Sequence, residues 1–473
     1  METLAARGRD APATEDLKNR DLRHVWHPFT QMWEHARERP PVIARGKGSY
    51  LWDSDGRQYL DGVSSLWVNV HGHGHPDLDR AVRRQLGKVA HSTLLGLSHP
   101  PAIELAERLA RIAPPGLTRV FYSDNGSTAV EVALKVAFQF WLQRGETAGD
   151  VGRDRFITLT NAYHGDTVGA VSLGGIDLFH GLYRPLLFEV DRAEAPYCYR
   201  CRRGLDSSSC GLACLEDLES LLKVRGQRVA GVVVEPMVQA AAGMLVWPRG
   251  YLSAVRRLCN EYETLLIADE VATGFGRTGR MFACEIEEVA PDILCLAKGL
   301  TGGYLPLAAT LTTDHVFGAF LGPYPELKTF LHGHTYTGNP LACAAALASL
   351  DVFNREGTLG RVLENIPYLR NELESLSGLE NVGDIRQLGY MIGIELVREK
   401  ESREPFELGE RAGHQVTLEA RARGLIIRPL GNVVVLMPPL SASREQLREM
   451  VSVLRAAIPA ACERLVPEGA AVR

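Results

Sequence analysis

Short apolar runs alternate with amphipathic segments through the middle of the chain. Residues 155–159, 229–234 and 265–268 carry apolar side chains on both alternating faces, which is typical of strands buried on both sides of a sheet. Residues 101–112 and 128–142 repeat their apolar positions at helical spacing. Buried strands separated by helices predict an α/β fold with a parallel or mixed sheet covered by helices on both sides.

The two ends of the chain have a different pattern. Residues 42–60 alternate apolar positions with two glycine-containing turns, which predicts a small meander near the N-terminus. A helical segment at 341–353 is followed by charged stretches and by expected strands at 391–397 and 433–437. These later segments predict a smaller α+β domain.

We therefore expect three parts in the chain. The first is an N-terminal segment, 1–70, that returns to join the small domain. The second is a large cofactor-binding domain, 71–345, and the third is a C-terminal small domain, 346–473. No internal repeat, low-complexity tract or long linker interrupts them.

Composition fits an enzyme that acts on small molecules. The chain has 473 residues, of which 45% are hydrophobic and 46 are glycine, enough for a large buried core. Its 52 basic and 57 acidic side chains give a net charge of -5 without long blocks of one sign, so we expect no nucleic-acid partner. The N-terminus is charged, and no stretch approaches the roughly 18 apolar residues of a membrane span. We expect a cytoplasmic protein without a membrane partner.

Two apolar runs end in side chains that can carry chemistry. One run ends at Lys298 and another at Asp269, so a sheet would present an amine and a carboxylate at the carboxyl ends of its strands. Pyridoxal phosphate (PLP) needs a lysine to hold its aldehyde as an imine, and a carboxylate to keep its ring nitrogen protonated. The pair predicts a PLP site in which Lys298 and Asp269 are catalytic.

Two further segments suit this cofactor. Gly126 and Ser127 directly precede the helix at 128–142, whose first N–H groups and positive end can hold a phosphate. Alone, this turn would more simply be a helix cap, but the lysine and the carboxylate favour a phosphate site. Tyr163 follows the strand at 155–159, where it would offer a face to a flat ring or else fill the rim of the sheet.

Four of the nine cysteines form a cluster, Cys198-x-x-Cys201 and Cys210-x-x-x-Cys214. Thiols at this spacing can hold zinc tetrahedrally. The alternative is a surface loop with incidental or oxidisable thiols. Because nothing else in the chain suggests dependence on a metal, we expect no metal in the catalytic site, and a structural metal in this loop is left open.

Five motifs resemble those of the class III, fold type I PLP aminotransferases. They are His-Val-Trp-His-Pro-Phe-Thr at 24–30, Tyr-His-Gly-Asp-Thr at 163–167, the segment 267–279 with Thr-Gly-Phe-Gly-Arg-Thr-Gly, the segment 291–303 with Ala-Lys-Gly, and His-Gly-His-Thr at 332–335. The resemblance extends over nearly the whole chain, and the Trp-His-Pro and Thr-Gly-Phe-Gly-Arg-Thr-Gly segments are specific. It implies a mixed, mostly parallel seven-stranded sheet covered by helices, with a smaller α+β domain.

The resemblance also implies a set of cofactor-binding residues: Gly126, Ser127, Tyr163, Asp269, Lys298, His334 and Thr335. Lys298 is expected to form the internal aldimine, Asp269 to partner the pyridinium nitrogen, and Tyr163 to act beside the ring. His334 and Thr335 are expected to reach the phosphate of the other subunit's cofactor. The implied assembly is a homodimer with shared active sites.

Within the family, the chain is similar to the subgroup that converts 8-amino-7-oxononanoate to 7,8-diaminononanoate in biotin biosynthesis. This substrate is a long aliphatic chain with a carboxylate at one end, so it suits an apolar tunnel that ends in a cation. Arg428 matches the carboxylate-binding arginine, or else is an exposed charge at a strand end. The implied substrate-binding residues are Phe29, Trp67, Tyr163, Gly333 and Arg428. Asp166 and Arg277 also match active-site positions, or order the loop as ion-pair partners.

Departures from the family pattern leave the amino donor open. Many relatives have tyrosine in place of Phe29, and a tryptophan pair in place of Leu66 and Trp67. Four segments are more similar to the branch that takes its amino group from lysine: residues 65–72, 90–96, 328–335 and 382–389. We therefore expect either S-adenosylmethionine or L-lysine as donor.

Other functions occur on the same fold. A general class III ω-aminotransferase would use pyruvate as its acceptor. An aminomutase would keep the amino group within one substrate, and a decarboxylase would release CO₂. A PLP-binding regulator without turnover is disfavoured because no DNA-binding segment is recognisable. Fold alone does not decide among these functions.

Overall fold

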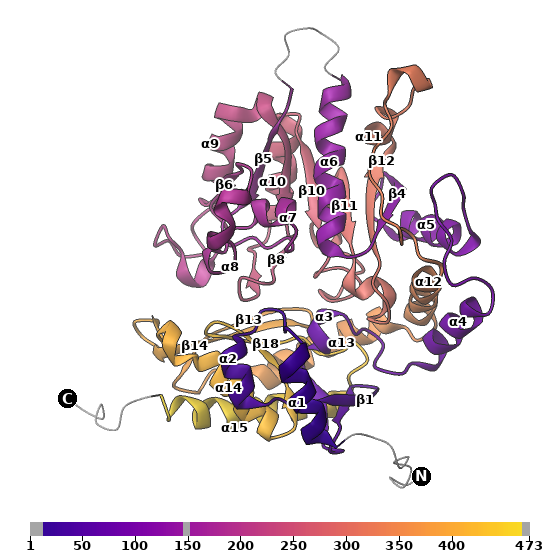
Figure 1. Ribbon diagram of the computed structural model, residues 1–473. Helices are drawn as coiled ribbons and strands as arrows, with labels where there is room; N and C mark the ends of the chain where they lie inside the picture. The colour runs from indigo at the N-terminus through magenta and orange to yellow at the C-terminus, as the bar shows by residue number, and fades with distance from the viewer. Residues whose placement is uncertain (1–12, 145–151, 466–473) are drawn as a thin grey trace.

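A seven-stranded sheet forms the centre of the computed structural model, which describes residues 13–144 and 152–465 (Figure 1). Its strands are β4 (Leu117–Ser123), β5 (Arg155–Leu159), β6 (Asp191–Ala193), β7 (Val229–Val234), β10 (Leu265–Asp269), β11 (Ile293–Leu296) and β12 (Ala308–Thr313). Their order is β4-β12-β11-β10-β7-β5-β6. β12 is antiparallel to both neighbours, whereas every pair from β11 to β6 is parallel. The predicted mixed, mostly parallel seven-stranded sheet is confirmed.

Helices cover both faces of this sheet. One face carries α6 (Gly126–Arg144) and α7 (Val168–Leu173), and the other carries α5 (Pro100–Ile112), α9 (Leu215–Arg225), α10 (Tyr251–Glu261) and α12 (Pro340–Arg355). Shorter elements connect them: α3 (Ser64–Trp67), α4 (Pro76–Leu86), α8 (Asp177–His180), α11 (Asp314–Gly318), β8 (Val238–Gln239) and β9 (Leu245–Val246). Within the described residues, no helix has the length and apolarity needed to cross a membrane.

The apolar strands have two buried faces because alternate side chains point to opposite sides of a sheet. In β10, Leu265 and Ile267 join the hydrophobic cluster around α6, while Leu266 and Ala268 join the larger cluster on the other face. All four side chains are at most 5% exposed. The continuous apolar runs in the sequence therefore correspond to strands covered on both sides, as predicted.

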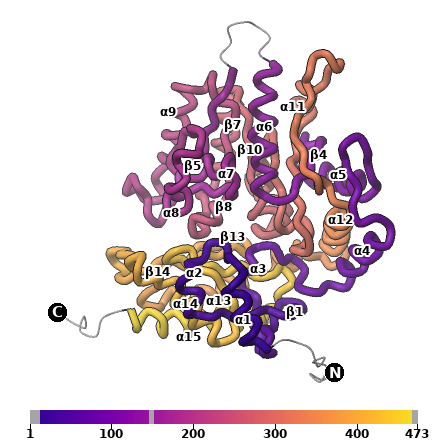
Figure 2. The backbone as a smooth tube through the Cα atoms, viewed as in Figure 1, coloured from indigo at the N-terminus to yellow at the C-terminus, as the bar shows by residue number. Residues whose placement is uncertain are grey.

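A second layer contains elements from both ends of the chain (Figure 2). From the N-terminal side come α1 (Thr14–His24), α2 (Met32–Glu38), β1 (Ile43–Lys47), β2 (Tyr50–Asp53) and β3 (Gln58–Asp61). From the C-terminal side come α13 (Thr358–Glu374), β13 (Val382–Leu388), β14 (Met391–Glu399), β15 (Glu404–Pro405), α14 (Ala412–Ala422), β16 (Leu425–Ile426), β17 (Arg428–Leu430), β18 (Val433–Leu436) and α15 (Arg444–Cys462). β3 pairs with β16 in parallel, so the N-terminal meander and the C-terminal elements share one sheet.

The three-part division at residues 70 and 345 stays a prediction. Residues 1–12 of the expected N-terminal segment, 145–151 of the large domain and 466–473 of the small domain lie outside the described residues. The individual segments agree closely with the structure: the helix expected at 128–142 corresponds to α6, which begins two residues earlier, at Gly126. That earlier start places Gly126 and Ser127 in the first turn of the helix.

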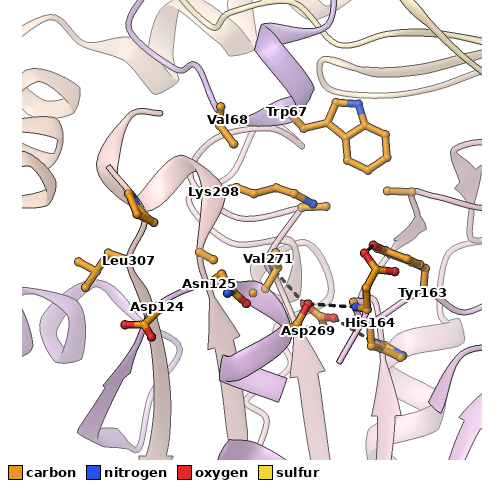
Figure 3. Close-up of a pocket in the computed structure, with 18 of the residues that line it drawn as sticks. Trp67, Val68, Asp124, Asn125, Tyr163, His164, Asp269, Val271, Lys298 and Leu307 are labelled. Atoms are coloured by element: carbon orange, nitrogen blue, oxygen red, sulfur yellow. Dashed lines mark hydrogen bonds and ion pairs between the residues drawn. The ribbon is translucent and has the colours of Figure 1, made fainter. Parts of the chain in front are cut away.

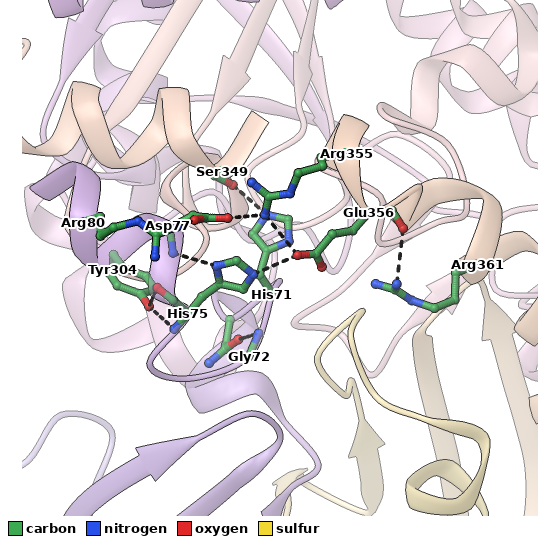
Figure 4. Close-up of polar contacts among 11 residues, drawn as sticks. His71, Gly72, His75, Asp77, Arg80, Tyr304, Ser349, Arg355, Glu356 and Arg361 are labelled. Carbon is green, nitrogen blue, oxygen red and sulfur yellow. Dashed lines mark hydrogen bonds and ion pairs between the residues drawn. The ribbon is translucent and has the colours of Figure 1, made fainter. Parts of the chain in front are cut away.

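A polar network joins the segment after α3 to α12 and α13 (Figure 4). His71 is buried, and its Nε2 lies 3.0 Å from Oγ of Ser349 in α12. His75 Nε2 lies 3.1 Å from Oε1 of Glu356, between the two helices. Burial lowers the pKa of His71 from 6.5 to about 3, and the neighbouring His75 lowers it further. His71 is therefore neutral in the folded protein at any ordinary pH.

We expect the stability that depends on a neutral His71 to be lost as the pH falls. The unfolded chain binds a proton at His71 below about pH 6.5, whereas the folded protein does not. Added acid therefore stabilises the unfolded state relative to the folded state. Between about pH 8 and pH 5 this one group removes about 2 kcal/mol from the free energy of unfolding. Urea unfolding of the wild type and of His71→Gln at both pH values measures the difference. Equal losses in the two proteins would contradict the prediction.

Candidate active site

A cavity of about 680 Å³ lies where the central strands end (Figure 3). Segments that follow β4, β5, β10 and β11 line it, together with the turn of α3. Six residues predicted from the sequence line this cavity: Trp67, Gly126, Ser127, Tyr163, Asp269 and Lys298. The carboxyl ends of neighbouring parallel strands meet at one edge of a sheet, which is why these distant segments converge.

Lys298 and Asp269 lie at the ends of adjacent parallel strands. Asp269 is in register with Cys295 of β11, and Lys298 follows that strand after Ala297. Lys298 has a φ of 42°, a left-handed conformation that non-glycine residues rarely adopt and that is concentrated at functional sites. Its Nζ lies 4.8 Å from the ring centroid of Trp67. Burial lowers the pKa of Lys298, although Asp269 opposes the shift, so the amine is more readily available as a nucleophile.

The Asp269 carboxylate is held from two directions. Oδ2 lies 2.7 Å from Nδ1 of His164, and Oδ1 accepts a hydrogen bond from the Val271 N–H at 3.0 Å. Both Asp269 and His164 are at most 5% exposed. Burial lowers the pKa of His164, but its hydrogen bond to Asp269 and the charge of that carboxylate outweigh burial and raise it. The imidazole therefore supports a charged carboxylate at a fixed position.

Glu235, which was not predicted from the sequence, also lines the cavity. Its carboxylate accepts hydrogen bonds from the backbone N–H groups of Tyr163, at 3.1 Å, and Ala240, at 3.0 Å. Burial raises the pKa of Glu235 to about 7. Glu235 directly follows β7, just as Asp269 ends β10, so the end of an apolar run was the signal that could have found it. His164 lies within the motif at 163–167, but only the fold places it against Asp269.

The start of α6 forms a narrow cradle. A Cβ on Gly126 would lie 2.6 Å from Cγ1 of Val271, and a Cβ on Gly165 would lie 2.0 Å from Oγ of Ser127. Only glycine fits at these two positions, so backbone can approach a ligand closely. The first N–H groups of a helix have no partner within the helix, and together with the helix dipole they attract an anion. A phosphate cradle, a buried carboxylate and a lysine on one cavity fit the expected PLP.

Phe29 and Arg428 approach this cavity from the second layer. Phe29 is 57% exposed, and its ring lies 5.5 Å from that of Phe179, which lies 6.3 Å from that of Tyr163. Arg428 is half-buried; burial lowers its pKa, and the nearby Tyr163 opposes the shift. Within the described residues, the Arg428 guanidinium has no hydrogen-bond or ion-pair partner. A desolvated cation without a partner is suited to bind a carboxylate.

The structure does not bring Gly333 or Thr335 into the cavity of their own chain. Both are exposed, while His334 Nδ1 lies 2.9 Å from Oδ2 of Asp124, which lines the cavity. Their expected contact with the other subunit's cofactor stays a prediction.

Arg277 is buried and donates hydrogen bonds to the carbonyls of Asn69 and Pro438, each at 2.7 Å, which orders the surrounding loops.

Asp166 and Tyr163 form a pair at the mouth of the cavity. The Tyr163 hydroxyl donates a hydrogen bond to Oδ2 of Asp166 at 2.7 Å, and both residues line the cavity. Burial raises the pKa of Tyr163, and the Asp166 carboxylate raises it further. The phenol therefore keeps its proton and can serve as a hydrogen-bond donor.

We expect His164→Leu to weaken the binding of PLP and to lower kcat. The change leaves the Asp269 carboxylate buried without its imidazole partner, and a hydrogen bond to a charged group is worth about 1.5–3 kcal/mol, or roughly tenfold to a hundredfold. Titration of the apoprotein with PLP and steady-state kinetics measure both effects. Thr158→Val is the matched control, because Thr158 Oγ1 contacts the other ring nitrogen of His164 at only 3.4 Å. Equal affinity and kcat in His164→Leu and the wild type would refute this role.

Comparisons with known proteins agree with the geometry of the site. The family model described as aminotransferase class-III matches residues 33–458. The adenosylmethionine-8-amino-7-oxononanoate aminotransferase of Nitratidesulfovibrio vulgaris is 59% identical over 96% of this chain and 83% of its own. The crystal structure of the enzyme of that name from Methanocaldococcus jannaschii matches with a TM-score of 0.90 and 45% identity, covering 95% of this chain and 99% of the other.

A third similar structure is an amine transaminase from an uncultivated Pseudomonas species in its PLP-bound form. It matches with a TM-score of 0.88 and 39% identity, covering 93% of this chain and 99% of its own. The family predicted from the sequence motifs is thus confirmed. This chain belongs to the class-III aminotransferases.

Proposed function

We propose that this protein transfers an amino group from S-adenosylmethionine to 8-amino-7-oxononanoate, which gives 7,8-diaminononanoate for biotin biosynthesis. The observation that carries the chemistry is the convergence of Lys298 and Asp269 on one cavity from adjacent strands. The choice of substrates is supported by the relatives reported above, whose names state both the donor and the acceptor. A cytoplasmic location stays a prediction.

The residues of the cavity fit PLP as the cofactor. When bound, PLP carries the amino group from donor to acceptor and stabilises negative charge on the reacting carbon through its protonated ring. Gly126 and Ser127 at the start of α6 would hold its phosphate through backbone N–H groups. Asp269, supported by His164, would keep a proton on the ring nitrogen. Tyr163 would pack beside the ring.

Lys298 serves as the general acid and base. Its lowered pKa favours the unprotonated amine, which can accept a proton from the reacting carbon and return it to a second carbon. Such a positioned base typically contributes roughly 10²–10⁴-fold to the rate. The same amine can act in both halves of the reaction, because each half moves one proton between the same two positions.

The region around Tyr163 suits a long keto acid. Phe29 and Phe179 form an aromatic wall, and the unpartnered Arg428 lies near the same tyrosine. The wall can pack against an aliphatic chain while the guanidinium holds the terminal carboxylate. Trp67, above Lys298, covers the reacting end. Pyruvate would use little of this apolar surface.

We also propose a homodimer with active sites shared between subunits. Exposed apolar side chains gather in the segment that carries Gly333 and Thr335: Tyr324, Leu327 and Leu331 are 71–85% exposed. Large exposed apolar side chains in one segment are typical of an interface. A second subunit would cover them and bring Thr335 to the cofactor phosphate of its partner.

The experiment that tests the function follows amino transfer by the purified PLP-loaded enzyme. We expect 7,8-diaminononanoate, detected by mass spectrometry, from 8-amino-7-oxononanoate and S-adenosylmethionine, and no product with Lys298→Ala, which lacks the base. L-lysine as the only effective donor would overturn the donor assignment. Preference for pyruvate over 8-amino-7-oxononanoate would make the protein a general ω-aminotransferase instead. Turnover by Lys298→Ala would contradict the role of that lysine.

We expect Arg428→Leu to raise KM for 8-amino-7-oxononanoate by roughly tenfold to a hundredfold, because a charged hydrogen bond worth about 1.5–3 kcal/mol is lost. The effect on kcat should be smaller. Arg423→Leu is the control, since it removes an exposed arginine whose ion pair with Glu419 contributes little. If both variants had the same KM as the wild type, Arg428 would not bind the substrate carboxylate.

A further inference from the structure

Four cysteines lie in the connection between β6 and α9, at the far edge strand of the seven-stranded sheet. Cys198 is the first residue of a short 3-10 turn and Cys201 directly follows that turn, while Cys214 directly precedes α9. The intervening residues form turns and bends, and most of them are exposed. None of these cysteines is in a disulfide bond. A long irregular connection without its own apolar core needs another source of order.

All four cysteines line one small cavity. Its volume is about 20 Å³, which is room for a single ion or water molecule and too little for an organic ligand. Cys198 is exposed, and the other three thiols are half-buried around this cavity. The fold thus unites two pairs that are separate in the sequence.

The four sulfurs do not lie close enough together in this structure to coordinate one ion. Within the described residues, the ligand atoms of only one trio lie within 4.8 Å of one another, namely those of Asp21, His27 and His35. In that trio, Asp21 already accepts from both imidazoles at 3.0 Å, so its groups satisfy each other. The thiols have no such partners among themselves. Binding of an ion would therefore require these exposed or half-buried side chains to rotate until their sulfurs meet.

We propose that Cys198, Cys201, Cys210 and Cys214 bind one zinc ion that closes this connection as a structural site. Four thiols from two closely spaced pairs match the tetrahedral sulfur coordination of structural zinc. On binding, each cysteine exchanges its S–H proton for a bond to zinc, so protons are released to solvent and nothing is oxidised or reduced. With four protein ligands, no position remains for water or substrate.

The site would stabilise a contact between the two sheets. Just beside Cys198, the Tyr197 hydroxyl donates to Glu395 of β14 at 2.5 Å, and Arg200 Nε donates to the same carboxylate at 2.6 Å. β14 belongs to the sheet that also contains β17 and hence Arg428. Zinc would therefore fix the connection where it joins the central sheet to the layer that carries the substrate arginine.

Metal analysis of the full-length protein tests the proposal. We expect elemental analysis by mass spectrometry to find about one zinc per chain after purification under reducing conditions. In Cys201→Ala and Cys214→Ala, which remove one ligand from each pair, zinc should fall at least about tenfold. Cys462→Ala, a buried cysteine at the end of α15, is the control and should retain the metal.

Cobalt provides a second measurement that does not depend on the variants. Wild-type protein stripped of metal and reloaded with Co²⁺ should show the visible absorption of tetrahedral cobalt and a near-ultraviolet thiolate band, both displaced by zinc. Wild-type protein that contains no zinc and binds neither ion would overturn the proposal. So would disulfides between these cysteines in freshly purified protein, or an iron–sulfur chromophore in place of zinc.

Discussion

The parallel pairing of β10 with β11 is the constraint on which the active site depends. It sets Asp269 and the lysine that follows β11 at one edge of the sheet, although 23 residues of turns and 3-10 helix separate the two strands. Because both strands are buried on both faces, a shift of register would expose apolar side chains and move the carboxylate away from the amine. The hydrophobic core thus determines the catalytic geometry.

Burial holds these side chains in fixed positions, but it also lowers the stability of the fold. Asp269, His164 and Glu235 are charged or titratable groups with little access to water, and such groups are tolerated only when they are paired. His164 pairs with Asp269, and backbone N–H groups pair with Glu235. The strained backbone at Lys298 adds a further cost. These costs in stability accompany a carboxylate held in a fixed position and an amine whose pKa is lowered.

The sequence predicted the sheet and the ends of its strands because both follow from local patterns. Continuous apolar runs marked β7 and β10, and the side chain at the end of one run marked Asp269. His164 could not be assigned in this way, since its role depends on a contact with a residue 105 positions away. Arg428 was found by resemblance alone. Its approach to Tyr163 depends on how the second layer sits on the sheet, which no local pattern specifies.

Chemistry and specificity come from different parts of the molecule. The amine, the carboxylate and the phosphate cradle belong to the central sheet and α6, which any PLP aminotransferase of this fold requires. Phe29 and Arg428 come from segments near the two ends of the chain and meet the site only through the second layer. Substitutions there can change the substrate without disturbing the pairing of β10 with β11. This separation explains why amine transaminases and aminotransferases of biotin synthesis share one fold, and why the substrate must be judged from the second layer.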